Sequence, residues 1–299
     1  MKGNRLLVIG IIMCTFLLLL AIIGPYLPFV EKELEEASRV RFGEKNDILT
    51  APFSPSQEFP FGSDHEGRNL LIVIIAGTRD TILIILSITI LRYILAIPLG
   101  LLASRNHGFF TWLVSAWNRV FSSVPTIFSK MLFLSIPVLV LDDNRLIWSI
   151  LILSLIEVGK VSFIIQEETR LIAKKPYIEA GITVGVHPIR QLTHHILPNI
   201  FPSVIVSFFI DIGRTALLVG QMGIFAIFIT QVFVQGGAFA AQMENTSLNW
   251  MTLLGSTRKD MLSSMWIPFY TCLAITLTIF TFTILGEGLR RYFDRSLKQ

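Results

Sequence analysis

Residues 177–199 read YIEAGITVGVHPIRQLTHHILPN, a polar stretch within an otherwise apolar chain. Apolar runs long enough to cross a bilayer flank it on both sides. Lys174, Lys175 and Arg190 lie in or beside it, and such positive charge accumulates on the cytoplasmic side of a membrane. The stretch is therefore predicted to be a cytoplasmic loop between two membrane-spanning helices, and it is long enough to be a tether or a docking surface.

Local signals in this loop favour an ordered helix-turn-helix. Pro176 suits the first turn of a helix, and Glu179 would then lie near the positive end of that helix. Gly185 is expected to end the first helix. Pro188 can begin a second helix, and Pro198 is predicted to close the unit.

The composition is typical of a polytopic membrane protein. Of 299 residues, 53% are hydrophobic and only 15% are charged, and the mean hydropathy is +0.66. Such a chain is too apolar for a soluble domain of this size. The net charge of +4 comes mostly from basic residues beside apolar runs, as membrane topology requires, so it gives little reason to expect a nucleic-acid partner.

The apolar runs predict an all-α polytopic fold with six transmembrane helices. The runs cover residues 6–27, 70–103, 110–141, 146–166, 200–220 and 261–285, and Pro125 and Pro137 are expected to bend the third. A short surface helix is expected at 31–45 and a separate outer helix at 224–233. Six spans place both termini in the cytoplasm, together with Lys2, Arg105 and the loop quoted above.

Charged residues inside the predicted spans form a second feature. Glu157 and Lys160 are three positions apart on one helix, and Asp211 and Arg214 repeat this spacing on the next, so each pair shares a helix face and can pair. A charge in hydrocarbon costs at least about 2.5–3.5 kcal/mol on insertion scales, so such residues face protein or water. They are predicted either to pair structurally within the bundle or to line a solute path.

The cytoplasmic loop resembles a known motif. Glu179-Ala180-Gly181, three residues, Gly185 and the ending His195-Ile196-Leu197-Pro198-Asn199 resemble the EAA loop of binding-protein-dependent, type I ABC importer permeases. The ending is similar to that of the dipeptide/oligopeptide/nickel branch. Gly181 departs from the second Ala that is usual there, which weakens a helix by roughly 0.5–1 kcal/mol.

A second stretch resembles the same branch. Residues 61–69 read FGSDHEGRN and resemble the element that precedes the second helix in these permeases. Gly62 and Gly67 at special turns, with Asp64 and Arg68 available to pair, would make a compact outer elbow. The resemblance implies a first transmembrane helix at 1–28, an extracytoplasmic loop at 29–69, an ABC transmembrane type-1 core at 70–291 with its coupling loop at about 168–199, and a cytoplasmic tail at 292–299.

What the resemblance implies about function is a permease subunit in a bacterial cytoplasmic membrane. ATPase coupling would fall to Glu179, Ala180, Gly181, Gly185, His195, Leu197 and Pro198. The implied partners are a second homologous permease, two ABC ATPases that carry ATP and Mg²⁺, an extracytoplasmic solute-binding protein and the lipid bilayer. Peptides are the default solute of the branch, and nickel or another small solute remains open.

No catalytic constellation emerges, so the chain is not expected to be an enzyme. It has no glycine-rich phosphate loop of the P-loop type and is expected to bind no ATP or other cofactor itself. His194 and His195 would project about 100° apart on a helix, so they cannot both face one ion. Asp64, His65 and Glu66 are adjacent on a turn and such residues rarely converge on one ion, so no metal site is predicted.

An alternative is a membrane sensor or scaffold that retains the permease fold without transport. It is motivated by the fifth predicted helix, where Arg214 and the run Leu217-Leu218-Val219-Gly220 replace the Glu and the Ser-Phe-Leu-Gly-Leu-Gly stretch typical of the branch. A permease should co-purify with ATPases, whereas a scaffold need not.

Overall fold

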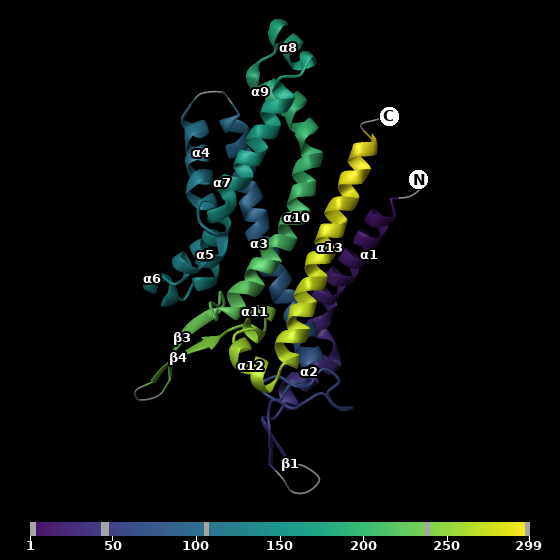
Figure 1. Ribbon diagram of the computed structural model, residues 1–299, viewed down its shortest axis with the longest axis vertical. Coiled ribbons are helices and arrows are strands. Elements are labelled where there is room, and N and C mark those ends of the chain that lie inside the picture. Colours follow the sequence, from purple (N-terminus) through teal and green to yellow (C-terminus); the bar gives the residue numbers. More distant parts are fainter. Residues whose placement is uncertain (1–3, 43–47, 105–107, 237–239, 297–299) are drawn as a thin grey trace.

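A computed structural model describes residues 4–42, 48–104, 108–236 and 240–296, so Lys2, Arg105 and residues 297–299 of the predicted tail lie outside the described part. Five helices in that part are long and apolar enough to cross a membrane. They are α1 (Arg5–Ile23), α3 (Leu70–Ala103), α7 (Arg145–Ala173), α10 (Leu197–Ile224) and α13 (Trp266–Ser296), and they run along the long axis of the molecule (Figure 1). The predicted all-α polytopic class is confirmed.

The third apolar run is not one bent helix, and that prediction is wrong. It is divided into α4 (Phe109–Ser122), α5 (Thr126–Leu134) and α6 (Pro137–Val140). Pro125 lacks a backbone N–H and disfavours the helical conformation at the residue before it, so α4 ends ahead of it and α5 begins after it. Pro137 opens α6 for the same reason.

One end of the bundle carries the short elements, which are η1 (Gly24–Tyr26), α2 (Pro28–Glu36), α11 (Trp250–Leu253), α12 (Thr257–Ser263) and two antiparallel hairpins (Figure 1). One hairpin joins β1 (Val40–Phe42) to β2 (Ile48–Thr50), with Val40 opposite Thr50. The other joins β3 (Gln231–Gly236) to β4 (Ala240–Asn245). These strands correct two predictions, because the surface helix ends at Glu36 and no helix occupies 224–233 once α10 has ended at Ile224.

The opposite end carries α8 (Pro176–Thr183) and α9 (Pro188–Gln191), together with the start of α1 and the end of α13 (Figure 1). Helices α1 and α13 approach closely there. A side-chain carbon on Gly10 would lie 2.7 Å from the backbone of Leu285, and Asn4 Nδ2 donates to the carbonyl of Gly288 at 2.6 Å. Small residues allow such close backbone contact between membrane helices.

Buried hydroxyl groups tie α3 to α7. Ser154 Oγ donates to the carbonyl of Ile88 at 2.9 Å, and Ser162 Oγ donates to that of Ala96 at 3.2 Å. Apolar side chains from α3, α7, α8 and α10 fill the same half of the bundle. This inner apolar cluster consists of Tyr93, Ala96, Val158, Val161, Ile165, Ile178, Ile196, Ile200 and Val204.

Candidate functional site

The loop that resembles the EAA motif is a helix-turn-helix, as its prolines and glycine predict. Helix α8 begins at Pro176, and Gly185 adopts a φ of +84°, a left-handed conformation that favours glycine. Helix α9 begins at Pro188, after His187, whose ring nitrogen Nδ1 accepts from the backbone N–H of Ile189 at 3.4 Å. We call residues 176–196 the prong, because they project from the end of the bundle (Figure 1).

Pro198 does not close this unit, contrary to the prediction. A π-helical turn, η2 (Leu192–Ile196), follows α9 directly, and α10 begins at Leu197. Pro198 therefore lies in the first turn of a long helix, where its missing N–H is harmless. The prong thus continues into α10 with no flexible link, while its other side joins α7 through Lys174 and Lys175.

One face of the prong is fastened to the bundle. Ile178 is 2% exposed and Ile196 is 6% exposed within the inner apolar cluster. Gln191 Nε2 donates to the carbonyl of Ile178 at 2.7 Å and so ties α9 to α8 within the prong. The opposite face is open, with the apolar side chains of Tyr177 and Val184 exposed. Of the predicted coupling residues, Glu179, Ala180, Gly185, His195 and Pro198 are exposed, and Gly181 and Leu197 are half-buried.

A network of charges occupies the middle of the bundle. Arg92 on α3 is 1% exposed and forms an ion pair with Glu157 on α7. Lys130 on α5, also 1% exposed, lies 3.4 Å from the same carboxylate. The predicted pair of Glu157 with Lys160 is wrong, because these two buried cations take Glu157 and the described contacts include no ion pair for Lys160.

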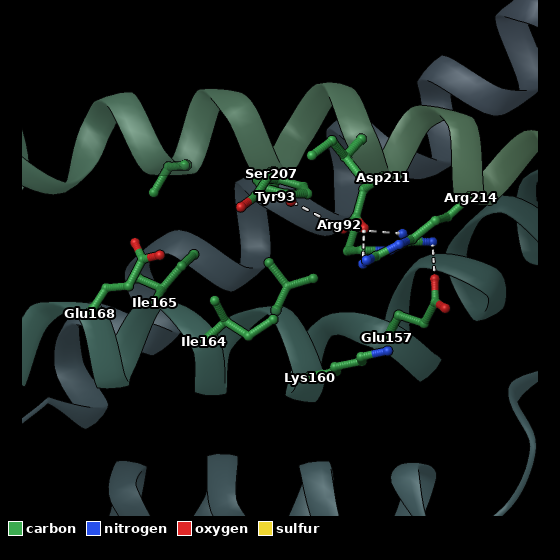
Figure 2. A pocket seen from close by; sticks show the side chains of 13 residues that line it. Arg92, Tyr93, Glu157, Lys160, Ile164, Ile165, Glu168, Ser207, Asp211 and Arg214 are labelled. Carbon is green, nitrogen blue, oxygen red and sulfur yellow. Dashed lines mark hydrogen bonds and ion pairs between the residues drawn. The ribbon is translucent and has the colours of Figure 1, made fainter. Parts of the chain in front are cut away.

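The second predicted pair is formed. Arg214 Nη1 donates to Asp211 Oδ1 at 3.1 Å on α10. Tyr93 Oη donates to the other oxygen of Asp211 at 3.0 Å, and Arg92 lies 3.8 Å from it (Figure 2). The charge cluster is thus Arg92, Lys130, Glu157, Asp211 and Arg214.

Arg92 and Lys130 were missing from the predicted site, although each is a cation inside an apolar run and so carries the signal of a functional position in a membrane helix.

A cavity of about 180 Å³ opens beside this cluster, between α3, α7 and α10 (Figure 2). Its wall includes both charged pairs predicted from the sequence, together with Tyr93, Glu168 and Ser207. A second cavity of about 340 Å³ lies at the break between α4 and α5, and it shares Glu157 and Lys160 with the first. Non-helical backbone at membrane depth is tolerated where it lines a cavity or is buried in protein, as at this break.

The elbow, residues 61–69, forms at the other end of the bundle. Gly62 and Gly67 have φ values of +76° and +81°, which the turn requires. Asp64, whose side chain is 3% exposed, accepts from Arg68 Nε at 2.7 Å and from the backbone N–H groups of Glu66 and Arg68 at 2.9 Å each. The predicted pair of Asp64 and Arg68 is therefore present, and it organises the turn.

Contacts distant in sequence fasten the elbow to the beginning of α13. Trp266 Nε1 donates to the carbonyl of Ser63 at 3.1 Å, and the rings of Phe61 and Tyr270 stack 4.1 Å apart. His65 Nε2 lies 2.9 Å from Asp260 on α12. Burial raises the pKa of the Asp260 carboxyl above its usual value, and His65 opposes that rise.

Most of the chain matches a known protein family. Residues 96–299 match the family model described as binding-protein-dependent transport system inner membrane component. The chain belongs to this family. The match includes the prong, Lys130, Glu157 and Asp211, whereas Arg92 and the elbow precede it.

Individual relatives agree with the family. The dipeptide transport system permease protein of Alkalihalophilus pseudofirmus is 24% identical over 298 residues, which is all of this chain and 88% of the relative. The oligopeptide permease protein of Bacillus subtilis is 23% identical over the same shares. The glutathione permease protein of Pectobacterium atrosepticum is 25% identical over 82% of this chain and 75% of the relative.

The protein is therefore a permease subunit of an ABC importer, as the loop motif predicted. Family members are transport permeases and not enzymes, and these relatives carry transport names, so they lend no support to the sensor or scaffold alternative. Among the described residues no group of three or more His, Cys, Asp or Glu side chains is placed to hold a metal ion.

Proposed function

We propose that the permease forms half of a translocation path for peptides and that a second, homologous permease subunit supplies the other half. The charge cluster and the two cavities that meet at Glu157 and Lys160 support this proposal, because they place polar groups and open space at the middle of α7. Intramembrane charges beside a cavity typically mark a solute pathway. The relatives named for dipeptides, oligopeptides and glutathione support a peptide solute.

The prong is the proposed docking site for an ABC ATPase, and a second ATPase would dock on the partner permease. ATP and Mg²⁺ would be bound by those subunits. The observation that carries this proposal is that Ile178 of the prong is buried in the same apolar cluster as Tyr93, which donates to Asp211 on the cavity wall. Close-packed side chains transmit displacement, so movement of the prong would reach the cavity.

The orientation follows from the same arrangement. The prong, the start of α1 and the end of α13 lie at one end of the bundle (Figure 1). Lys174 and Lys175 lie between α7 and α8, Arg190 belongs to α9, and Arg290 belongs to the last part of α13. We place this end in the cytoplasm of a bacterial cell, because positive charge favours that side. The elbow, α12 and the hairpins would then face outward, where a solute-binding protein delivers its ligand.

The test is to substitute the prong in the assembled importer, reconstituted in proteoliposomes. Glu179→Gln removes an exposed charge. Gly185→Ala places a Cβ atom on a residue with a left-handed backbone, at a cost of about 1–2 kcal/mol. We expect either variant to lower solute uptake per ATP hydrolysed by about tenfold or more, since a coupling free energy of 1–3 kcal/mol corresponds to roughly 5–150-fold.

Glu167→Gln is the matched control, because Glu167 is an exposed carboxylate of α7 just outside the prong and pairs only with Arg170 in the described part of the chain. This control should leave coupling unchanged. Unchanged uptake per ATP in both prong variants, in complexes that assemble normally, would refute the proposed coupling role.

A further inference from the structure

One lysine beside the charge cluster, Lys160, has no ion pair among the described residues. Glu157 is held by Arg92 and Lys130, and Asp211 is held by Arg214 and Tyr93. Lys160 lies one helical turn beyond Glu157, on the wall of both cavities, and no carboxylate of the described residues lies within ion-pairing distance of its Nζ atom.

Lys160 is also placed where an unmatched charge is costly. It is the sixteenth of the 29 residues of α7, near the middle of a helix that spans the membrane, and its side chain is exposed. An ammonium group at that depth requires water or a counter-anion. Its position on the cavity wall, with Arg214 across the same cavity, points to an anionic group that binds there from outside this chain (Figure 2).

The far end of the same cavity has the opposite character. Glu168 lies on the wall there and accepts from Ser203 Oγ at 2.6 Å, with no cation of the described residues within ion-pairing distance. Between Lys160 and Glu168 the wall is mainly apolar, with Val161, Ile164, Ile165 and Val204, and Ser207 adds a hydroxyl group. The cavity thus has one end with more cations than carboxylates, a mainly apolar middle and an anionic end.

The spacing of the two charged ends sets a length. Glu168 follows Lys160 by eight positions on α7, which corresponds to about 12 Å along the helix axis. Two or three residues of extended peptide span roughly 7–11 Å, which leaves room for an ion-pair contact at each end. The volume of about 180 Å³ is below the 300–1,000 Å³ of pockets for drug-sized ligands, so the occupant is small.

We propose that this cavity holds a short peptide by both termini, with Lys160 binding the terminal carboxylate and Glu168 binding the terminal ammonium group. Arg214 would assist Lys160, and the apolar wall would take a side chain of the peptide. This inference rests on the proposed transport of peptides and adds to it the residues that select for free termini and for length.

The experiment is calorimetric titration of peptides onto the importer complex in lipid nanodiscs, with the solute-binding protein left out so that only the membrane subunits select. Three forms of one tripeptide are compared: the free peptide, its C-terminal amide and its N-acetyl derivative. The variants are Lys160→Gln, Lys160→Arg and Glu168→Gln, with Glu167→Gln as the control because Glu167 does not line the cavity.

We expect Lys160→Gln to lower the affinity for the free peptide by about tenfold or more, as loss of one charged contact predicts. The affinity for the amide should change by less than about twofold. Lys160→Arg should restore binding of the free peptide. Glu168→Gln should lower the affinity for the free peptide and leave the affinity for the N-acetyl form unchanged. The Glu167→Gln control should bind all three forms as the unsubstituted complex does.

Equal weakening of all three forms by Lys160→Gln would overturn the proposal and would assign Lys160 to a carboxylate of the partner permease. Absence of binding of the free peptide to the unsubstituted complex at millimolar concentration would overturn it as well. Uptake of the free tripeptide by the complete importer in proteoliposomes is measured alongside. If the binding results overturn this inference but the unsubstituted importer still takes up the free tripeptide, the proposed function stands. If the unsubstituted importer takes up no peptide, the proposed function itself is refuted.

Discussion

The elbow and the prong lie at opposite ends of the bundle, and the two ends are built on opposite principles (Figure 1). The elbow turns its polar groups inward, with the Asp64 side chain 3% exposed and Trp266 closing over Ser63. The prong turns apolar groups outward, with Tyr177 47% exposed and Val184 84% exposed. The elbow is complete within this chain, whereas the prong presents a surface that another protein can cover.

This difference predicts that the two ends of the bundle differ in stiffness. The elbow, which precedes α3, is joined to the beginning of α13 by a hydrogen bond and a ring stack, and to α12 by the contact of His65 with Asp260. It therefore holds the ends of two spans together. The prong is packed against the bundle chiefly through Ile178 and Ile196, its two residues in the inner apolar cluster. Elements with few buried contacts are the ones that move, so the comparison predicts that the end with the elbow is stiff and that the end with the prong responds to its partner.

The largest effect is expected from removing the acid of the elbow. Asp64→Ala leaves Arg68 and two backbone N–H groups without their acceptor in a nearly buried turn. We expect a loss of about 3–5 kcal/mol of stability, as for a broken buried ion pair, measured as a fall in the thermal unfolding midpoint in detergent. Asp64→Asn, which keeps an acceptor oxygen, should lose less. A midpoint unchanged in both variants would break the comparison, because the end with the elbow would not depend on this turn.

Features that depend on contacts between residues close in the sequence could be predicted. The turn at Gly185 and the pair of Asp64 with Arg68 involve residues within one or two turns of each other, and their types alone indicate them. Pro198 was misread because a proline suits the first turn of a helix as well as the residue after its end. Hydropathy alone also gave one span for residues 110–141, since it measures apolar character and not continuity of the helix.

The partners of Glu157 in the charge cluster and the fastening of the elbow could not be predicted. Glu157 takes its partners from α3 and α5, and the spacing that favoured Lys160 says nothing about cations on other helices. In the same way His65 meets Asp260, and Trp266 meets Ser63, only after the chain has folded. The helices that carry the site could be predicted from the sequence, whereas the pairing of side chains on different helices depends on how the helices pack.

An intermediate effect should appear in the pH dependence of stability at the end with the elbow. Burial raises the pKa of Asp260 above the usual value of 3.8, so the folded state holds that proton more tightly than the unfolded state does. The contribution of Asp260 to stability is therefore complete below that value and is lost as pH rises through the raised pKa. Asp260→Asn cannot ionise, so its unfolding midpoint should be less dependent on pH.

The measurement is the unfolding midpoint from pH 4 to pH 7, for the unsubstituted permease and for Asp260→Asn. The difference between them should move by a few degrees in favour of the variant as pH rises. His65→Gln should enlarge the loss on raising the pH, because it removes the side chain that opposes the rise in the pKa of Asp260. Parallel curves for the unsubstituted chain and Asp260→Asn would show that this carboxyl has the same pKa folded and unfolded.

The smallest effect on stability is expected at the tip of the prong. Val184→Ser removes a side chain that is 84% exposed, and such surface changes usually alter stability by less than about 0.5 kcal/mol. Leu262→Ser is the matched control, because Leu262 is 92% exposed on α12 at the other end. We expect neither to shift the unfolding midpoint, but only Val184→Ser to reduce recovery of ATPase subunits when the tagged permease is purified. Equal recovery in the two variants would show that Val184 contributes no more to ATPase binding than an exposed apolar side chain at the opposite end of the bundle does.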